Sequence, residues 1–345
     1  MSNTTEDPNE YLYLFIFEGK VYNLKDWITI HPGGSLWFCH AYGRDLTHVI
    51  HSYHAKPELC RKILAKYVTN HDPKPLLKRF LNVPEHVLPE GFDASEDQMK
   101  FDWDAEGTVT KRLKEIVFSK DFAARVKKMD FLFDFVGVTL FVLHCLMAFP
   151  GLYYHVIPAW LMVLFFFCTR TGMAAIGHYH SHRKKDGITD WGDCLFDMQY
   201  VGTCIIAFDG HGMIHHTQTN SLADVKRTVF TGVLNIPRIW RVPAETARRF
   251  GHIFTGTFIR WASLHLIENE NTPRIFLIQF RTFLIRCLLI AECVFAWYTD
   301  NFGLWFAQYF VTLWYNLFLI VSSHDFEEGY ESKAETRGKQ DWGRF

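Results

Sequence analysis

The chain has 345 residues, a formal net charge of -1 at pH 7 and only 21% charged residues, while 49% are hydrophobic and 17% aromatic. The near-neutral charge excludes the basic surface expected of a nucleic-acid-binding protein, and the length allows about two or three domains. The eight cysteines contain no Cys-x-x-Cys pair, which excludes a zinc or disulfide framework and favours reduced thiols in a cytosolic or membrane environment.

The N-terminal segment "MSNTTEDPNE" is polar and acidic. It lacks the basic and then apolar order of a signal peptide, so we expect the N-terminal part to stay in the cytosol. Before about residue 130 the composition is that of a soluble protein, and after it long apolar runs dominate, which predicts a membrane part.

The first motif is "HPGG" at 31–34, followed by "GRDLT" at 43–47 and "HSYH" at 51–54. Together these residues resemble a cytochrome b5 domain. The resemblance implies an α+β haem-binding domain within residues 1–90, with haem b held between the axial ligands His31 and His54. Two axial imidazoles leave no open position for oxygen, so such an iron transfers single electrons.

Other histidines in this region compete for the same role. His51 is the rival of His54, although the spacing typical of the family favours His54. His40 and His48 are predicted to be exposed and without a role. Taken alone, "HPGG" would also suit an ordinary turn, since Pro-Gly-Gly is turn chemistry in any protein. Residues 91–130 are predicted to form a linker and a pre-membrane helix.

Four apolar runs in the remainder, 131–345, approach the ~20 residues needed to cross a bilayer; they are 131–149, 155–177, 275–298 and 303–323. The last run carries no charge. The run 275–298 holds Arg281, Arg286 and Glu292, so its alternative is a buried or interfacial helix. The predicted fold class is therefore an α+β haem domain followed by an all-α membrane domain with four transmembrane helices.

The loops of the four runs predict their orientation. The short loops 150–155 and 298–303 contain no Lys or Arg, whereas "RVKK" at 125–128 and "HRKK" at 182–185 are basic. By the positive-inside rule the basic ends face the cytosol, which makes this an integral membrane protein with both termini cytosolic. Two further apolar segments are too short to span and are predicted to be interfacial helices: 193–208 and 252–267.

Two histidine clusters, "HYHSH" at 178–182 and "HGMIHH" at 211–216, fall on the predicted cytosolic face. The first and last histidines of "HYHSH" stand at i, i+4 on one helical face and can share a metal. In the second cluster His211 and His215 repeat this spacing. The adjacent His216 is turned by about 100° round the helix, so it can reach a second ion. Neither cluster has the Glu of the zinc protease motif HExxH. His180 is predicted to point away from its neighbours.

With the haem domain in front, the clusters resemble those of membrane fatty acid desaturases with a fused cytochrome b5 domain, and of the similar insect cytochrome b5-related proteins. The resemblance implies two non-haem iron ions and oxygen-dependent acyl desaturation, with hydroxylation as a near alternative. It also implies NADH-cytochrome b5 reductase as electron source, an acyl lipid or acyl-CoA substrate, and the endoplasmic reticulum membrane. The implied iron ligands are His178, His182, His211, His215, His216 and, in "SSHDF", His324.

The family's third histidine box does not occur in this sequence, although "QDWGRF" at 340–345 resembles the segment that precedes it. Whether the chain is an enzyme therefore stays open. We favour an interrupted form of a competent desaturase, which would need the third box to be active. The alternative is a membrane-anchored haem electron carrier whose desaturase-like part is not catalytic. A zinc-site membrane hydrolase or a receptor is disfavoured by the haem motif.

Overall fold

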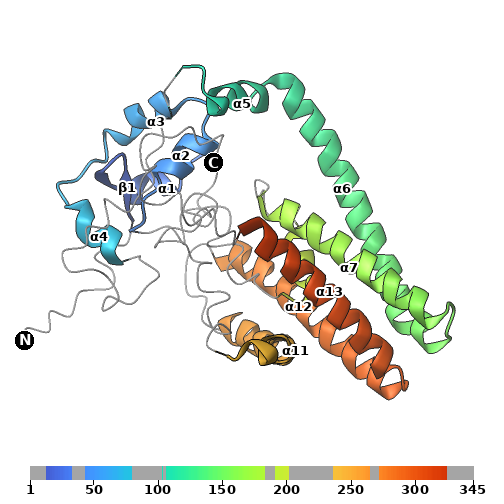
Figure 1. The fold of residues 1–345 in the computed structure, drawn as a ribbon. Helices are drawn as coiled ribbons and strands as arrows, with labels where there is room; N and C mark the ends of the chain where they lie inside the picture. The colour runs from blue at the N-terminus through green and yellow to red at the C-terminus, as the bar shows by residue number, and fades with distance from the viewer. Residues whose placement is uncertain are drawn as a thin grey trace, which may run out of the picture. The chain divides into compact units, whose positions relative to one another are not determined.

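The computed structural model describes residues 13–32, 43–79, 103, 106–182, 191–201, 236–264 and 272–324. The chain divides into two compact units. The N-terminal unit contains the described residues up to Ala123, and the helical unit begins at Ala124. The ribbon and the element labels are shown in Figure 1.

The N-terminal unit begins with an antiparallel hairpin of β1 (Leu14–Phe17) and β2 (Lys20–Asn23). Its two turn residues, Glu18 and Gly19, both have positive φ, 48° and 73°. Such a two-residue loop matches the right-handed twist of the strands. Because successive side chains point to opposite faces, the alternating residues of β1 enter two different apolar clusters.

Among the described residues of this unit, five short helices follow the hairpin: α1 (Lys25–Ile28), α2 (Thr47–Tyr53), α3 (Pro57–Leu64), α4 (Pro73–Arg79) and α5 (Val109–Val117). The main cluster packs Phe15 and Phe17 of β1 against Val49 of α2 and Leu64 of α3. Isolated β-bridges join Asp45, which precedes α2, to β1 and Val68, which follows α3, to β2. This is the α+β arrangement that the sequence predicts for the N-terminal domain.

In the part of the helical unit that the structure describes, the elements are helices. They are α6 (Lys120–Leu146) with its π-helical end η3 (Met147–Gly151), α7 (Ala159–His182), the 3-10 helix η4 (Gly192–Gln199), α11 (Arg238–Leu264), α12 (Thr272–Tyr298) and α13 (Phe302–His324). Helices thus occupy all four predicted spans. They form two hairpins, α6–α7 and α12–α13, and α7 lies beside α13 (Figure 1).

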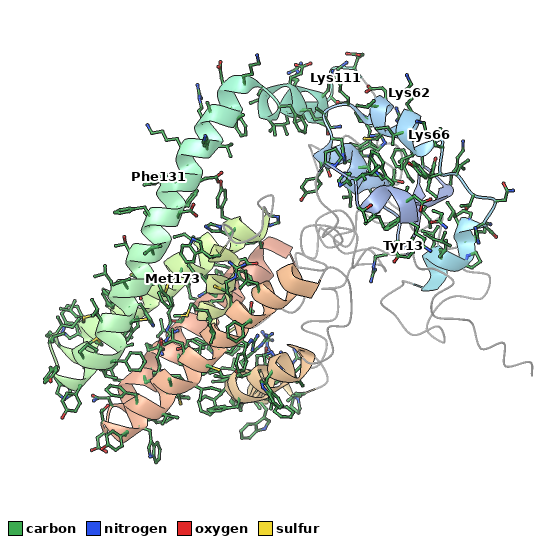
Figure 2. All side chains as sticks on the ribbon, turned by 180° about the vertical axis from the view of Figure 1, so that it is seen from behind. Tyr13, Lys62, Lys66, Lys111, Phe131 and Met173 are labelled. Carbon is green, nitrogen blue, oxygen red and sulfur yellow. The ribbon has the colours of Figure 1, made fainter. Side chains whose placement is uncertain are left out.

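Two helices within the described residues are long and apolar enough to cross a membrane, judged by length and composition: Lys120–Gly151 and Ala159–His182. Only 17% of the most apolar window of the first is buried. Phe131 on α6 is 75% exposed, whereas Met173 on α7 is fully buried (Figure 2). Length and composition therefore support two of the four predicted spans. The runs 275–298 and 303–323 are helical as predicted, and their crossing of a membrane stays a prediction.

Several ionisable side chains inside the predicted spans have charged partners. Glu292 of α12 accepts hydrogen bonds from Arg170 of α7 and from His144 of α6, and all three side chains are at most 2% exposed. Arg286 forms an ion pair with Asp197 of η4, Nε to Oδ2 2.8 Å. Ionisable groups in apolar helices normally face the interior and pair in this way. The run 275–298 is thus a helix whose Arg286 and Glu292 are buried in the bundle, and its crossing of a membrane stays a prediction.

The two predicted interfacial helices differ from the structure. The prediction is wrong for the described part of 193–208, because every residue of η4 is buried, against α7 and α12. A Cβ on Gly177 would lie 2.2 Å from the backbone nitrogen of Phe196, so glycine is what lets η4 approach α7 so closely. The second segment belongs to α11, which is much longer than predicted and exposes Trp240 and Phe258.

Candidate functional site

In the N-terminal unit the His31 and His54 rings face each other. His31 follows α1 and His54 is the C-terminal cap of α2, and their ring centres are 6.1 Å apart at an interplanar angle of 55°. An imidazole nitrogen binds a first-row metal at about 2 Å and lies roughly 1 Å from the centre of its own ring. Two imidazoles that bind one metal from opposite sides therefore have ring centres about 6 Å apart. The pair therefore has room for one metal atom between the rings.

The tautomer of His54 suits this use. Its Nδ1 lies 3.0 Å from the Ile50 carbonyl oxygen. A carbonyl only accepts, so Nδ1 carries the proton and donates it. The lone pair of Nε2 is left to bind a metal, and a backbone bond of this kind is how proteins fix a ligating histidine.

His51, the rival of His54, is already engaged. Its Nε2 lies 2.9 Å from Oε1 of Glu18, which also accepts hydrogen bonds from Arg61. Burial lowers the pKa of His51, although Glu18 opposes this effect. Burial would raise the pKa of Glu18, but the hydrogen bonds from Arg61 and His51 lower it below its ordinary value. Neutral His51 thus joins the hairpin turn to α2 and α3.

Trp103, beyond the predicted domain boundary, covers two histidines of α2. Its ring stacks on His51, with centres 5.1 Å apart and planes 7° apart, and lies 5.8 Å from the ring of His48. The prediction that His48 is exposed is wrong, because only 5% of it is accessible. His40 lies outside the described residues. Sequence reasoning missed Glu18, Arg61 and Trp103, because no local motif joins them to α2.

In the helical unit His178 and His182 lie at the C-terminal end of α7. Their ring centres are 5.0 Å apart, as expected for i, i+4 positions on one helical face. His180 lies on another side of the helix, as predicted. It is fully buried, and its Nε2 lies 3.1 Å from Oδ1 of Asp134 on α6. A Cβ on Gly192 would lie 2.4 Å from the His180 ring, so η4 closes directly over it.

The remaining predicted metal ligands are only partly placed. His211, His215 and His216 lie outside the described residues. His324 is the last residue of α13, and its side chain is not described. Because α7 and α13 both start at the hairpin loops, their C-terminal ends, and with them His178, His182 and His324, lie at the same end of the bundle (Figure 1). Within the described residues, no three His, Cys, Asp or Glu side chains gather as a metal site.

The pairing of Arg170 with Glu292 was also missed from the sequence, although one signal was available. Opposite charges in two separate apolar runs cannot both face lipid, and such groups usually find each other. Arg170 further donates to Gln308 at 3.0 Å, and its guanidinium lies 4.6 Å from the centre of the Tyr200 ring. These side chains fasten α7, α12, α13 and the chain after η4 to one another.

Comparison with known proteins gives matches for part of the chain. The cytochrome b5-like heme/steroid binding domain family matches residues 4–71. The acyl-lipid (8-3)-desaturase of Physcomitrium patens is 53% identical over 49 residues, and the delta(5) fatty acid desaturase A of Dictyostelium discoideum is 40% identical over 50 residues. The acyl-lipid (8-3)-desaturase B of Dictyostelium discoideum is 36% identical over 52 residues.

These three matches cover 14–15% of this chain and only 10–11% of the relatives' own length. No solved structure matches the chain. The family match encloses His31 and His54, and it ends well before the helical unit begins at Ala124. The chain therefore carries a cytochrome b5-like domain at its N-terminus.

Proposed function

We propose that this chain is a desaturase-type oxidoreductase, in which a haem held by the N-terminal domain supplies electrons to a histidine-bound iron centre of the helical unit. The observation that carries the proposal is the His31–His54 pair, spaced by 6.1 Å within a segment that matches the cytochrome b5-like family. Three relatives named as acyl-lipid or fatty acid desaturases support the same class of chemistry.

His31 and His54 would hold the haem iron, and His51 would not. The Ile50 carbonyl holds the proton of His54 on Nδ1, whereas Nε2 of His51 is bonded to Glu18. Val49 of α2 and Leu64 of α3 belong to the apolar cluster of the same unit. A haem with two axial imidazoles, when bound, supplies one-electron transfer without binding oxygen.

His178 and His182 would be two ligands of the non-haem centre, joined by the ligands proposed from the sequence: His211, His215, His216 and His324. Imidazole is a common ligand of iron, and an iron with open positions supplies oxygen chemistry. The role of His180 would be different. By pairing with Asp134 it fastens α7 to α6 and so holds its two neighbours in place.

The helical unit would lie in a membrane, with the histidines at its cytosolic face. Large apolar side chains of α6 are exposed, while His144, Arg170 and Glu292 are buried and paired with one another, the reverse of a water-soluble protein. From Ala159 to His178, α7 rises by about 30 Å, the thickness of a bilayer core. The same proposal includes a location in the endoplasmic reticulum membrane, with both termini in the cytosol. It also includes NADH-cytochrome b5 reductase as the electron source and an acyl lipid or acyl-CoA as the substrate.

Metal analysis of the purified full chain tests the proposal. It predicts haem together with about two non-haem irons per haem, and an oxygen-dependent new double bond in an added acyl substrate. Replacing His178 and His182 by Ala should remove non-haem iron and leave the haem spectrum unchanged. Haem without non-haem iron in the unaltered protein would instead favour a membrane-anchored electron carrier.

A further inference from the structure

A short basic segment lies near the start of α6. Its cations are Arg125, Lys127 and Lys128, and all three side chains are exposed. Among the ranges that the structure describes, no ion pair involves any of them. Their charges are therefore available to a partner outside the chain.

The acids that follow this segment on α6 are engaged within the helical unit. Asp130 accepts a hydrogen bond from the hydroxyl of Tyr179 on α7. The Oδ1 atom of Asp134 lies 3.1 Å from Nε2 of His180 on the same helix. Both carboxylates thus have partners on α7, and neither is recorded in an ion pair with the basic segment.

The basic segment leads into an exposed apolar stripe on the same side of α6. Side chains three, four or seven positions apart share one face of a helix. Phe131 follows Lys128 by three positions and Lys127 by four. Phe135 and Val138 continue the same face, and Phe131 (labelled in Figure 2), Phe135 and Val138 are 75%, 62% and 47% exposed. The cations therefore stand one helical turn from the beginning of an unpartnered apolar surface.

The length of this stripe suits a bilayer. From Phe131 to Gly151 the helix rises by about 30 Å, which is the thickness of the hydrocarbon core. On the membrane placement proposed above, on which this inference rests, Lys127 and Lys128 then stand about 5–6 Å outside the core. The headgroup layer adds roughly that much on each side of a bilayer, so both lysines lie at its level.

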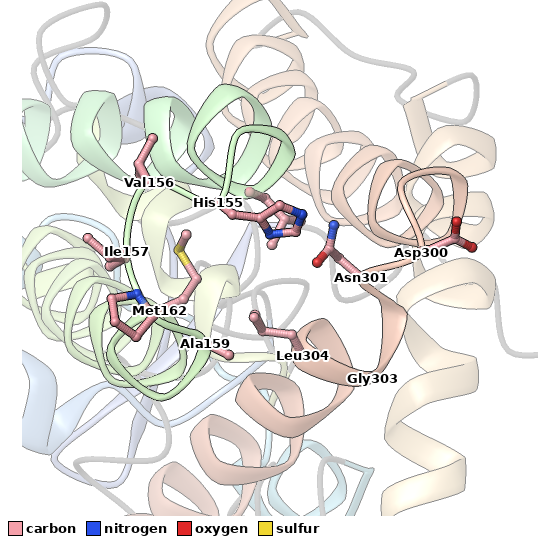
Figure 3. A pocket seen from close by; sticks show the side chains of 11 residues that line it. His155, Val156, Ile157, Ala159, Met162, Asp300, Asn301, Gly303 and Leu304 are labelled. Atoms are coloured by element: carbon pink, nitrogen blue, oxygen red, sulfur yellow. The ribbon is translucent and has the colours of Figure 1, made fainter.

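The opposite end of the helical unit offers no comparable charge. The hairpin loops 150–158 and 298–304 contain no Lys or Arg. The cavity that both loops line has His155, Asp300 and Asn301 among its residues (Figure 3). An attraction for negatively charged headgroups is therefore expected at the end where α6 begins.

We propose that Arg125, Lys127 and Lys128 bind the headgroup of an anionic phospholipid. The two ammonium groups and the guanidinium donate to the oxygens of the negatively charged headgroup, while an acyl chain packs along Phe131 and Phe135. Charge complementarity favours this occupant, because clusters of Lys and Arg beside a membrane helix attract anionic lipids. A zwitterionic lipid has no net charge with which to balance the three cations.

Native mass spectrometry of the full chain, purified in detergent with equal amounts of phosphatidylserine and phosphatidylcholine, tests the proposal. One cation near an anionic lipid surface corresponds to about a fivefold change in binding. The unaltered protein should therefore retain phosphatidylserine over phosphatidylcholine by at least about tenfold. The triple variant Arg125→Gln, Lys127→Gln and Lys128→Gln should retain the two lipids nearly equally.

The matched control is the triple variant Lys20→Gln, Lys62→Gln and Lys66→Gln, which removes three exposed cations from the N-terminal unit. It should keep the preference of the unaltered protein. Equal retention of both lipids by the unaltered protein, or the same loss of preference in the control, would overturn the lipid site. Extraction of the unaltered chain from membranes by alkaline carbonate would instead overturn the membrane placement, whereas a chain that resists extraction without preferring phosphatidylserine would leave that placement intact.

Discussion

Removing the carboxylate of Glu292 tests whether the buried ion pair organises the helical unit. Glu292 accepts hydrogen bonds from Arg170 and from His144, whose Nε2 is 3.0 Å from its Oε1. Their side chains are 2%, 1% and 0% exposed. The change Glu292→Leu leaves the Arg170 guanidinium buried without its counter-charge. Because these side chains are almost inaccessible to solvent, water cannot take the place of the lost carboxylate.

The expected cost follows from this burial. Removing one partner of a buried ion pair destabilises a protein by about 3–5 kcal/mol. Arg170 keeps its bonds to Gln308 at 3.0 Å and to the Met198 carbonyl at 3.3 Å, so we expect the lower part of that range. Replacing both charges, as Arg170→Met with Glu292→Leu, should cost less than about 2 kcal/mol, because apolar side chains of similar volume often replace a buried pair at little cost.

The assay is denaturant-induced unfolding of the purified chain in mild detergent, followed by tryptophan fluorescence. Asp300→Asn serves as the control, because Asp300 is an exposed acid of the same unit, and should change the free energy of unfolding by no more than about 0.5 kcal/mol. If the double variant loses as much stability as the two single variants added together, the side chains are not coupled and the account of the buried pair is wrong.

Two further predictions concern packing and acid stability. Gly177→Ala should lower the free energy of unfolding of the helical unit by roughly 1–3 kcal/mol in the same assay, since its Cβ would overlap the backbone of Phe196; no measurable loss would contradict the close approach. The pKa values of His51 and Glu18 both lie below their ordinary values, so their contributions to stability are complete above about pH 6.5 and are lost as the pH falls. Thermal unfolding followed by circular dichroism should show a midpoint that decreases from pH 7 to pH 5. The decrease should be steeper in Glu18→Gln, because Glu18 opposes the lowering of the His51 pKa, and a midpoint that increases on acidification would contradict the assignment.

The helices of the four apolar runs could be predicted because each run has helical length, a signal carried by neighbouring residues. The partners inside the bundle could not, since Arg170 and Glu292 are 122 positions apart and only packing brings them together. The burial of η4 was missed for a related reason. A short apolar segment reads the same whether it faces a membrane surface or two helices, and Gly177, which permits the contact, lies in a different element.

In the N-terminal unit the spacing of His31 and His54 was sufficient to propose the pair, whose rings the structure places 6.1 Å apart. The burial of His48 was not predictable, because the ring that covers it belongs to Trp103, outside the recognised motif. The second histidine cluster, 211–216, lies outside the described residues, so its part in the iron centre stays a prediction from its spacing.

The absorption and electron paramagnetic resonance spectra of the purified chain test the central claim most directly. We expect a low-spin haem with two imidazole ligands. That signal should persist in His51→Ala, since Nε2 of His51 is bonded to Glu18, and should disappear in His31→Ala and in His54→Ala. A low-spin signal that survives His54→Ala and is lost in His51→Ala would contradict the assignment of the haem site.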